Sequence, residues 1–184
     1  NTPCDEVNES VAELAWTLML ALSRRLPEAS EFMRNAAYRG WDPDIFVGRD
    51  MKGKTLGIVG MGRIGGMVAR RAVGFEMKVI YHNRTPLRPD QIGASLGAGT
   101  LEYREKLEDL LAGADFVSLH VPLTPETRHL INGKNLSLFR KTAVLVNTAR
   151  GPIVDEAEVG EALRAGMIAG YGADVFENEP DPHP

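Results

Sequence analysis

One segment constrains the fold of this chain more than any other, a glycine-rich stretch with the sequence GMGRIG. It follows a short apolar run at residues 56–59, which has the character of a buried strand, and it precedes a helix-like run at residues 67–75. A strand, a Gly-x-Gly-x-x-Gly turn and a helix in this order form the context that the dinucleotide-binding fingerprint requires. The segment therefore predicts a βαβ unit with a phosphate-binding turn.

The spacing of the glycines has a physical reading. Gly60 allows the tight turn, Gly62 lets the backbone approach a pyrophosphate, and Gly65 lets helix and strand pack closely. The free N–H groups near Arg63 and Ile64 would face the anion at the start of the helix. The alternative is a glycine-rich turn that binds no ligand.

Apolar runs and helix-like segments alternate through the rest of the chain. The further strands are predicted at residues 77–83, 115–121, 143–149 and 168–176. The helices between them are predicted at residues 106–114, 133–142 and 156–166. This alternation is typical of right-handed βαβ crossovers, and the continuous apolar strands fit a sheet covered on both faces. We predict an α/β fold, a Rossmann-type doubly wound parallel sheet with helices on both faces. It has five clear strands and a short extra one near residues 98–101.

A helical segment leads into this pattern. The spacing predicts a helix over residues 8–26, capped by Asn8 or Ser10, and a shorter one over residues 28–38. The apolar stripe of the first helix consists of Val11, Leu14, Leu18 and Leu22. We assign residues 1–184 to one dinucleotide-binding domain, with residues 1–50 as a leading helical segment and residues 51–184 as the Rossmann core.

Composition and charge exclude several classes of protein. A net charge of −4, with no basic stripe, argues against a nucleic-acid partner. Cys4 is the one cysteine, which rules out an intrachain disulfide, and no two histidines have the spacing of a zincin site, so no metal is expected. Residues 11–22 are too short an apolar run to span a membrane, and the first ten residues lack the basic region of a signal peptide. We expect a cytoplasmic protein without a membrane partner.

The end of the second strand bears on the choice of cofactor. Asn83 stands where NAD-binding proteins carry an acid for the ribose hydroxyls, and no Asp or Glu is near it. Arg84 follows and can pair with a 2′-phosphate, to which Asn83 and Thr85 can add hydrogen bonds. NADP(H) is therefore preferred. NAD(H) remains possible if Arg84 is a solvated charge and Asn83 serves the ribose hydroxyl alone.

Four segments together resemble a known family. GMGRIGGMVARRAVGF, DFVSLHVPLTPETRHLI, VLVNTARGPIVDE and GADVFENEP are similar to the nucleotide-binding domain of the D-isomer-specific 2-hydroxyacid dehydrogenases. The resemblance covers nearly the whole chain, and the YHNRT segment is similar to the NADP(H)-using glyoxylate and hydroxypyruvate reductases of that family. It implies hydride transfer between NADP(H) and a small 2-keto or 2-hydroxy acid.

The resemblance also implies roles for individual residues. Arg150 matches the arginine that binds the carboxylate and carbonyl of the substrate, and Glu179 matches the glutamate that keeps a catalytic histidine protonated. In the family that histidine lies in a TPH-type motif further downstream. His183 lacks the motif and is not assigned the role.

Further positions match the cofactor site of the family. Asp174 resembles the aspartate that holds the nicotinamide carboxamide, and Thr148, Ala149 and Arg150 resemble the positions beside the ring. The loop against which the adenosine lies would contain His120, Val121, Pro122 and Thr127. We expect His120 to be a packing residue and not an acid–base group.

The resemblance implies that this chain contains only a part of the whole enzyme. We expect the substrate domain of the same protein to be absent, so that the chain alone binds cofactor and turns over little. The first helix resembles a segment that packs across a homodimer, although its stripe could instead pack on its own domain. Two other functions stay open: a phosphite or formate dehydrogenase on the same scaffold, and a non-catalytic, NAD(H)-sensing module like a corepressor. Formate enzymes of this kind carry a glutamine where Glu179 stands, and the Asn83–Arg84 pair argues against NAD(H) sensing.

Overall fold

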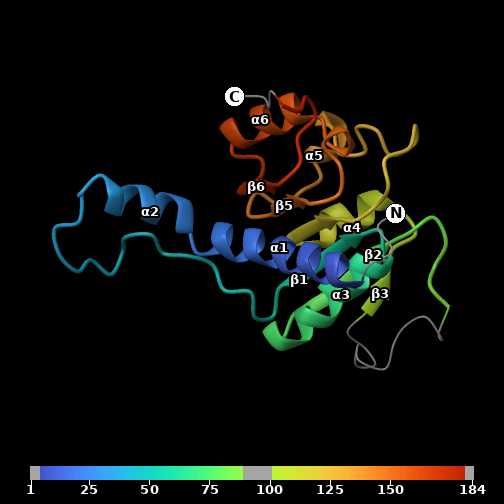
Figure 1. Ribbon diagram of the computed structural model, residues 1–184, viewed down its shortest axis with the longest axis horizontal. Coiled ribbons are helices and arrows are strands. Elements are labelled where there is room, and N and C mark those ends of the chain that lie inside the picture. The colour runs from blue at the N-terminus through green and yellow to red at the C-terminus, as the bar shows by residue number, and fades with distance from the viewer. Residues whose placement is uncertain (1–4, 89–100, 181–184) are drawn as a thin grey trace.

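A computed structural model describes residues 5–88 and 101–180 of the chain. Its six strands form one parallel sheet in the order β3-β2-β1-β4-β5-β6 (Figure 1). The strands are β1 (Thr55–Val59), β2 (Lys78–His82), β3 (Leu101–Tyr103), β4 (Phe116–Leu119), β5 (Val144–Asn147) and β6 (Gly170–Ala173). This order is that of the doubly wound dinucleotide-binding fold. The predicted Rossmann-type fold is confirmed.

Helices cover both faces of the sheet. They are α1 (Asp5–Ser23), α2 (Leu26–Arg34), α3 (Arg63–Ala72), α4 (Leu107–Gly113), α5 (Gly133–Leu136) and α6 (Glu156–Arg164), with single 3₁₀ turns η1 (Val73–Phe75) and η2 (Gly151–Ile153). Strand side chains alternate between two hydrophobic clusters. Leu56 and Ile58 of β1 join the cluster that contains α1 and α3, and Val59 joins the cluster of α4, α5 and α6. Every residue of β4 and β5 is buried, as the continuous apolar pattern predicts.

The first helix is part of the core, although its predicted details are wrong. Ala12, Ala15 and Met19 are fully buried, and the indole of Trp16 donates a 3.0 Å hydrogen bond to the carbonyl of Val68. The described helix begins at Asp5, so Asn8 and Ser10 lie inside it and do not cap it. The small alanines let α1 approach the sheet closely, which places the predicted stripe on the flank of the helix.

The flank of α1 has its own packing partner. A Cβ added to Gly172 of β6 would lie 3.1 Å from Leu22 Cδ1 and 3.2 Å from Leu18 Cβ. These leucines of the predicted stripe therefore cover the glycines of the edge strand. These two of the four stripe residues pack on their own domain, as the alternative to a dimer contact expects, and the dimer remains a prediction.

Several other boundaries differ from the prediction for local reasons. α2 ends at Arg34 instead of residue 38, because the chain takes a left-handed turn at Ala36 (φ 51°). The helix predicted at 133–142 is a single turn ending at Leu136, held by a capping box between Asn132 and Asn135. By contrast, α3 begins at Arg63, where the free N–H groups of the helix start were expected. Of the strand expected near residues 98–101, the described part is Leu101, which begins β3, and the rest lies outside the described residues.

The segment between α1 and β1 projects from the body of the molecule (Figure 1). α2, described over its whole length, buries none of its side chains. The arm, defined here as residues 26–50, returns to the sheet at Met51, which is buried. Inside the arm, Phe32 and Phe46 pack edge to face, with ring centroids 5.3 Å apart.

Candidate functional site

The glycine-rich turn has the close backbone contacts that its sequence predicts. Gly60 has a left-handed backbone (φ 97°), and a Cβ there would lie 2.7 Å from the carbonyl oxygen of His120. A Cβ at Gly65 would overlap the carbonyl oxygen of Gly60. Larger residues at either position would push β1, β4 and α3 apart.

Gly62 differs from these two glycines, because a Cβ there would meet no described atom within 4 Å. It is the N-cap of α3 and is exposed. The N–H groups of Arg63 and Ile64 belong to the first turn of α3 and have no acceptor within that helix. Open space in front of free backbone N–H groups and the positive end of a ten-residue helix suits a pyrophosphate.

A groove of about 880 Å³ opens at this turn, on the carboxyl edge of the sheet. Its walls come from the turn after β1, the loops after β4 and β5, and the first turns of α1. The lining residues are Val7, Asn8, Val11, Gly62, Arg63, Ile64, His120, Val121, Pro122, Leu123, Thr148, Ala149 and Arg150. Open α/β sheets bind their ligands at this edge, where the strand order reverses between β1 and β4. The structure thus brings together nine of the candidate site residues that the sequence analysis named.

The α1 wall of the groove was missed by sequence reasoning. Asn8 is 7% exposed, and its Nδ2 has no hydrogen-bond partner among the described residues. The buried hydroxyl of Thr148, across the groove, is also without one in the described chain. Asn8 and Thr148 both line the groove, and each keeps one buried polar atom without a partner in the described chain, which fits a polar ligand that reaches them. The sequence pattern indicated Asn8 only as a candidate helix cap, because no local pattern shows that α1 reaches this edge of the sheet.

Asn83 holds the glycine-rich turn. Its Oδ1 accepts a 2.7 Å hydrogen bond from the N–H of Met61, and its carbonyl oxygen accepts a 3.2 Å bond from the hydroxyl of Tyr103. Arg84 and Thr85 follow it and are exposed. The described lining of the groove does not include these three residues, which continue the same edge beyond Gly62.

His120 is a neutral packing residue. Its Nε2 lies 2.8 Å from the hydroxyl of Ser118, which is fully buried on β4. Burial lowers the pKa of His120 to about 4. An imidazole that is neutral at pH 7 is a much weaker proton donor than an imidazolium, which agrees with the packing role expected for His120.

Thr127 shapes the loop after β4. Its hydroxyl donates to the carbonyl of Pro122 at 2.7 Å and accepts from the N–H of Thr124 at 2.8 Å. Val121 and Pro122 line the groove, whereas Thr127 is absent from the described lining. The structure therefore gives Thr127 an indirect part in the site, through the shape of that loop.

Arg150 lies at the rim of the groove, where its side chain is exposed. The backbone around it is fixed by Asn147, a fully buried residue at the end of β5. Asn147 donates through Nδ2 to the carbonyl of Arg150 at 3.0 Å and accepts the N–H of Ala149 at 3.1 Å. The guanidinium donates through Nη1 to the carbonyl of Ala149 at 2.5 Å. A rigid backbone that carries an exposed guanidinium, whose other N–H groups remain, suits recognition of a planar anion.

Asp174 and Glu179 follow β6, beside the loop that carries Arg150. Partial burial raises the pKa of Asp174, and the neighbouring carboxylate of Glu179 adds to the rise. Glu179 Oε1 accepts a 2.9 Å hydrogen bond from the N–H of Phe176. A Cβ at Gly151 would overlap the carbonyl of Phe176. The loops of Arg150 and Glu179 are therefore in direct backbone contact, although neither acid is in the described lining of the groove.

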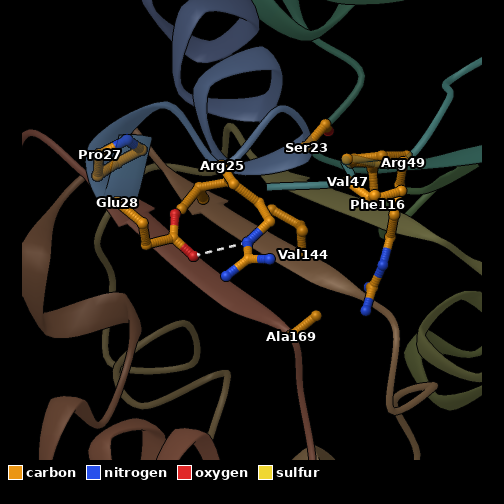
Figure 2. Close-up of a pocket in the computed structure, with 11 residues that line it drawn as sticks. Ser23, Arg25, Pro27, Glu28, Val47, Arg49, Phe116, Val144 and Ala169 are labelled. Atoms are coloured by element: carbon orange, nitrogen blue, oxygen red, sulfur yellow. Dashed lines mark hydrogen bonds and ion pairs between the residues drawn. The ribbon is translucent and has the colours of Figure 1, made fainter. Parts of the chain in front are cut away.

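A second cavity of about 460 Å³ lies at the opposite edge of the sheet (Figure 2). Phe116 and Val144, the first residues of β4 and β5, line it together with residues of α1 and the arm. Arg25 pairs there with Glu28 at 3.1 Å. The amino ends of parallel strands are not where this fold binds ligands, so we take the larger groove as the functional site.

The described residues offer neither a metal-binding cluster nor a membrane-spanning helix. No cluster of three or more His, Cys, Asp or Glu side chains within residues 5–88 and 101–180 could hold a metal ion. Across the same ranges, none of the helices combines the length and apolar character needed to cross a bilayer.

Comparison with known proteins agrees with this geometry. Residues 16–184 match the family model of the D-isomer specific 2-hydroxyacid dehydrogenase, NAD binding domain. Glyoxylate reductase of Thermococcus kodakarensis is 50% identical over 184 residues, which is 98% of this chain and 53% of that protein. Glyoxylate reductase of Aeropyrum pernix is also 50% identical over 184 residues, with the same coverage.

A solved structure gives the same result. The crystal structure of a glyoxylate reductase from Paecilomyes thermophila superposes with a TM-score of 0.87 at 40% identity. The superposition covers 100% of this chain and 52% of that one. The chain spans about half the length of the relatives it matches.

Proposed function

The chain belongs to the D-isomer-specific 2-hydroxyacid dehydrogenases, as their NAD-binding domain, and we propose that its parent enzyme reduces a small 2-keto acid with NADPH. Glyoxylate and hydroxypyruvate are the proposed substrates. Relatives named glyoxylate reductase favour this activity over a phosphite or formate dehydrogenase and over a nucleotide-sensing module. The substrate-binding part of the enzyme would lie in sequence outside this chain.

One observation carries the proposal, the groove at the carboxyl edge of the sheet. It joins the phosphate-binding turn at Gly62 to the guanidinium of Arg150 through the loop of His120–Pro122. Backbone N–H groups stand at one end and a cation at the other. A dinucleotide lying along the groove would place its pyrophosphate on α3 and its reacting end near Arg150.

Arg150 would bind and polarise the substrate. A guanidinium offers two parallel N–H donors to a carboxylate and can also donate to the adjacent keto oxygen. The hydrogen bond from Nδ2 of Asn147 to the carbonyl of Arg150 would fix the backbone of Arg150, and the arginine would then hold the substrate over the groove. A bound dihydronicotinamide would supply the hydride at this position.

Glu179 would control the proton. Its carboxylate, next to a histidine from the rest of the enzyme, would favour the charged imidazolium that donates a proton to the keto oxygen. The carboxylate of Glu179 lies close enough to Asp174 to add to the rise in the pKa of Asp174. When ionised, Asp174 would accept hydrogen bonds from a carboxamide.

NADPH would be selected by the segment after β2. Asn83 uses Oδ1 for the N–H of Met61, so its Nδ2 donor is left to face the ribose. Arg84 adds an exposed cation, and no acidic residue follows β2 before Pro86. Donors and a positive charge suit a 2′-phosphate, whereas an acid would repel it.

The test has two parts. Titration of this chain with NADPH and NADH should give tighter binding of NADPH, and Arg84→Ala should abolish the difference. With the full-length protein, Arg150→Ala should lower kcat/KM for glyoxylate and hydroxypyruvate at least 100-fold, with Arg150→Lys in between. Equal binding of both cofactors would refute the NADP preference, and an active Arg150→Ala enzyme would refute the role of the arginine.

The enzyme is also proposed to be a homodimer held by the arm. Trp41 is 84% exposed and Val47 is 63% exposed on a segment that projects from the body (Figure 1). Exposed large apolar side chains on a projecting segment are typical of an interface. Light scattering should give twice the monomer mass for the wild-type protein and the monomer mass for Trp41→Ser combined with Val47→Ser. A monomeric wild type would overturn the proposal.

A further inference from the structure

The side chain of His129, in the loop after β4, lies between two carboxylates of other segments. Its Nε2 is 2.5 Å from Oε1 of Glu177, which follows β6. Its Nδ1 is 3.6 Å from Oδ2 of Asp155, the N-cap of α6. Arg128 adds a cation 3.9 Å from the same Glu177 oxygen. The imidazole therefore bridges three segments that are far apart in the sequence.

Backbone hydrogen bonds tie the same segment to the loop of Arg150. The N–H of His129 donates to the carbonyl of Pro152 at 2.9 Å, and the N–H of Ile131 donates to the carbonyl of Ile153 at 3.1 Å. Pro152 follows Arg150 by two residues. Movement of the His129 segment would consequently be transmitted to the Arg150 loop.

Glu177 connects His129 to the other catalytic position. It precedes Glu179 by two residues, and the N–H of Phe176 between β6 and Glu177 donates to the Glu179 carboxylate at 2.9 Å. A Cβ at Gly151 would lie 2.5 Å from the N–H nitrogen of Glu177. The two loops thus touch at Gly151 and are joined a second time by the His129 side chain.

The backbone of His129 is itself unusual. Its φ is 49°, in the left-handed region that non-glycine residues seldom occupy. The amide of Asn132 donates to the carbonyl of His129 at 2.8 Å and helps to hold this conformation. Such a conformation persists only where surrounding contacts determine it, and it is often found at functional sites.

We infer that His129 is a positioning residue, which sets the placement of Glu179 relative to Arg150 through its bridge to Glu177. The inference rests on the proposed function, since it concerns the two catalytic positions named there. His129 is not proposed to touch substrate or cofactor. Its effect would reach the chemistry through the loop after β6.

The choice of variants follows from the geometry. His129→Asn keeps a residue that tolerates the left-handed backbone, but its amide is too short to reach Glu177. His129→Gln can place an N–H donor near the position of Nε2 and should restore the bridge in part. Glu177→Gln removes the negative charge that faces Nε2 of His129. Glu76→Gln is the matched control, because it makes the same change in the ion pair with Lys52 at the opposite edge of the sheet.

The experiment uses the full-length enzyme and reads kcat, KM and their pH dependence. His129→Asn and Glu177→Gln should each lower kcat about tenfold, with the Kd for NADPH unchanged, and His129→Gln should recover to within about threefold of wild type. A misplaced Glu179 would support the catalytic imidazolium less well, so the alkaline limb of the reduction profile should move to lower pH by about one unit. General damage to the fold would not move that limb.

A second readout does not depend on activity. Hydrogen exchange at the N–H of Phe176 should be faster in His129→Asn than in wild type and in Glu76→Gln, because the bond to Glu179 is loosened. Unchanged exchange, or a pH profile equal to that of wild type, would overturn the inference. An inactive wild-type enzyme would refute the proposed function alone, since the exchange rates would still decide whether His129 holds the loop.

Discussion

Oδ1 of Asn83 accepts a 2.7 Å hydrogen bond from the N–H of Met61, so the residue that follows β2 also anchors the glycine-rich turn after β1. The side chain of Asn83 thereby links the segment after β2 to the turn after β1. Its oxygen is committed to the turn, and its amide nitrogen is the part left for a ligand. Asn83 would for this reason offer a donor to the ribose of a bound cofactor.

Asn83→Asp should therefore reverse the cofactor preference. One carboxylate oxygen can keep the bond to Met61, while the other presents an acceptor to a ribose hydroxyl and repels a 2′-phosphate. We expect NADPH binding to weaken at least tenfold, about 1.4 kcal/mol, and NADH binding to tighten. Fluorescence titration of the wild type and the variant measures both. Weaker binding of both cofactors to the same degree would mean that the turn had collapsed and that Asn83 does not select.

Asn8→Leu should stabilise the fold while it weakens the binding of cofactor or substrate. The orphaned Nδ2 in the groove is a buried donor without a partner in the described chain, so its replacement by a side chain of similar size should raise the unfolding free energy by about 1 kcal/mol. If that donor meets the cofactor or the substrate, binding should weaken about tenfold in the same variant. Urea denaturation and NADPH titration, run on one preparation, measure the two effects. A less stable variant would show that the amide is satisfied in the native fold.

Gly151→Ala should be strongly destabilising. The new Cβ would overlap the carbonyl of Phe176, and both sides of the contact are backbone that cannot rotate away. We expect a loss of about 2–4 kcal/mol in unfolding free energy. Gly160→Ala is the control within α6, where the nearest described atom lies 3.6 Å from the new Cβ, and it should be neutral or stabilising by up to about 1 kcal/mol. Thermal or urea unfolding of the three proteins decides, and equal losses in both variants would contradict the proposed backbone contact.

His120 should make the fold sensitive to acid. Its pKa falls from an ordinary value of about 6.5 when unfolded to about 4 when folded, so the unfolded chain binds the extra proton between these two values. Unfolding free energy should then decrease as the pH is lowered through that window, by about 2–3 kcal/mol at pH 4.5 relative to pH 7. His120→Gln stays neutral and can still reach Ser118, so its decrease should be smaller by that amount. Urea denaturation at several pH values measures the difference, and parallel curves would exclude His120 as the source.

Local sequence patterns predicted the sheet and the turn because both depend on short-range chemistry. Continuous apolar runs must be buried on both faces, and the steric limits at Gly60 and Gly65 admit no side chain. Arg150 and the loop of His120–Pro122 were named from the resemblance to the family, and their place after strands of a parallel sheet explains why they gather at one edge.

Helix ends were predicted less well. α1 begins before its expected caps, and the residues it buries, among them Ala15 and Met19, are not those of the predicted leucine stripe. The sheet selected the face with small residues, because alanine permits a closer approach. Periodicity indicates that a helix has an apolar face, but it cannot distinguish two adjacent faces of similar character.

The sequence by itself determined the class of fold, the phosphate-binding turn and the order of the loops along the ligand edge, because each follows from neighbouring residues. Only the tertiary structure decided which distant residues meet there. It brought Asn8 of α1 into the groove, joined Asn83 to Met61, and set His129 against Glu177. These contacts cross 22 to 48 residues of chain, and they depend on how helices and loops pack over the sheet, which no local pattern encodes.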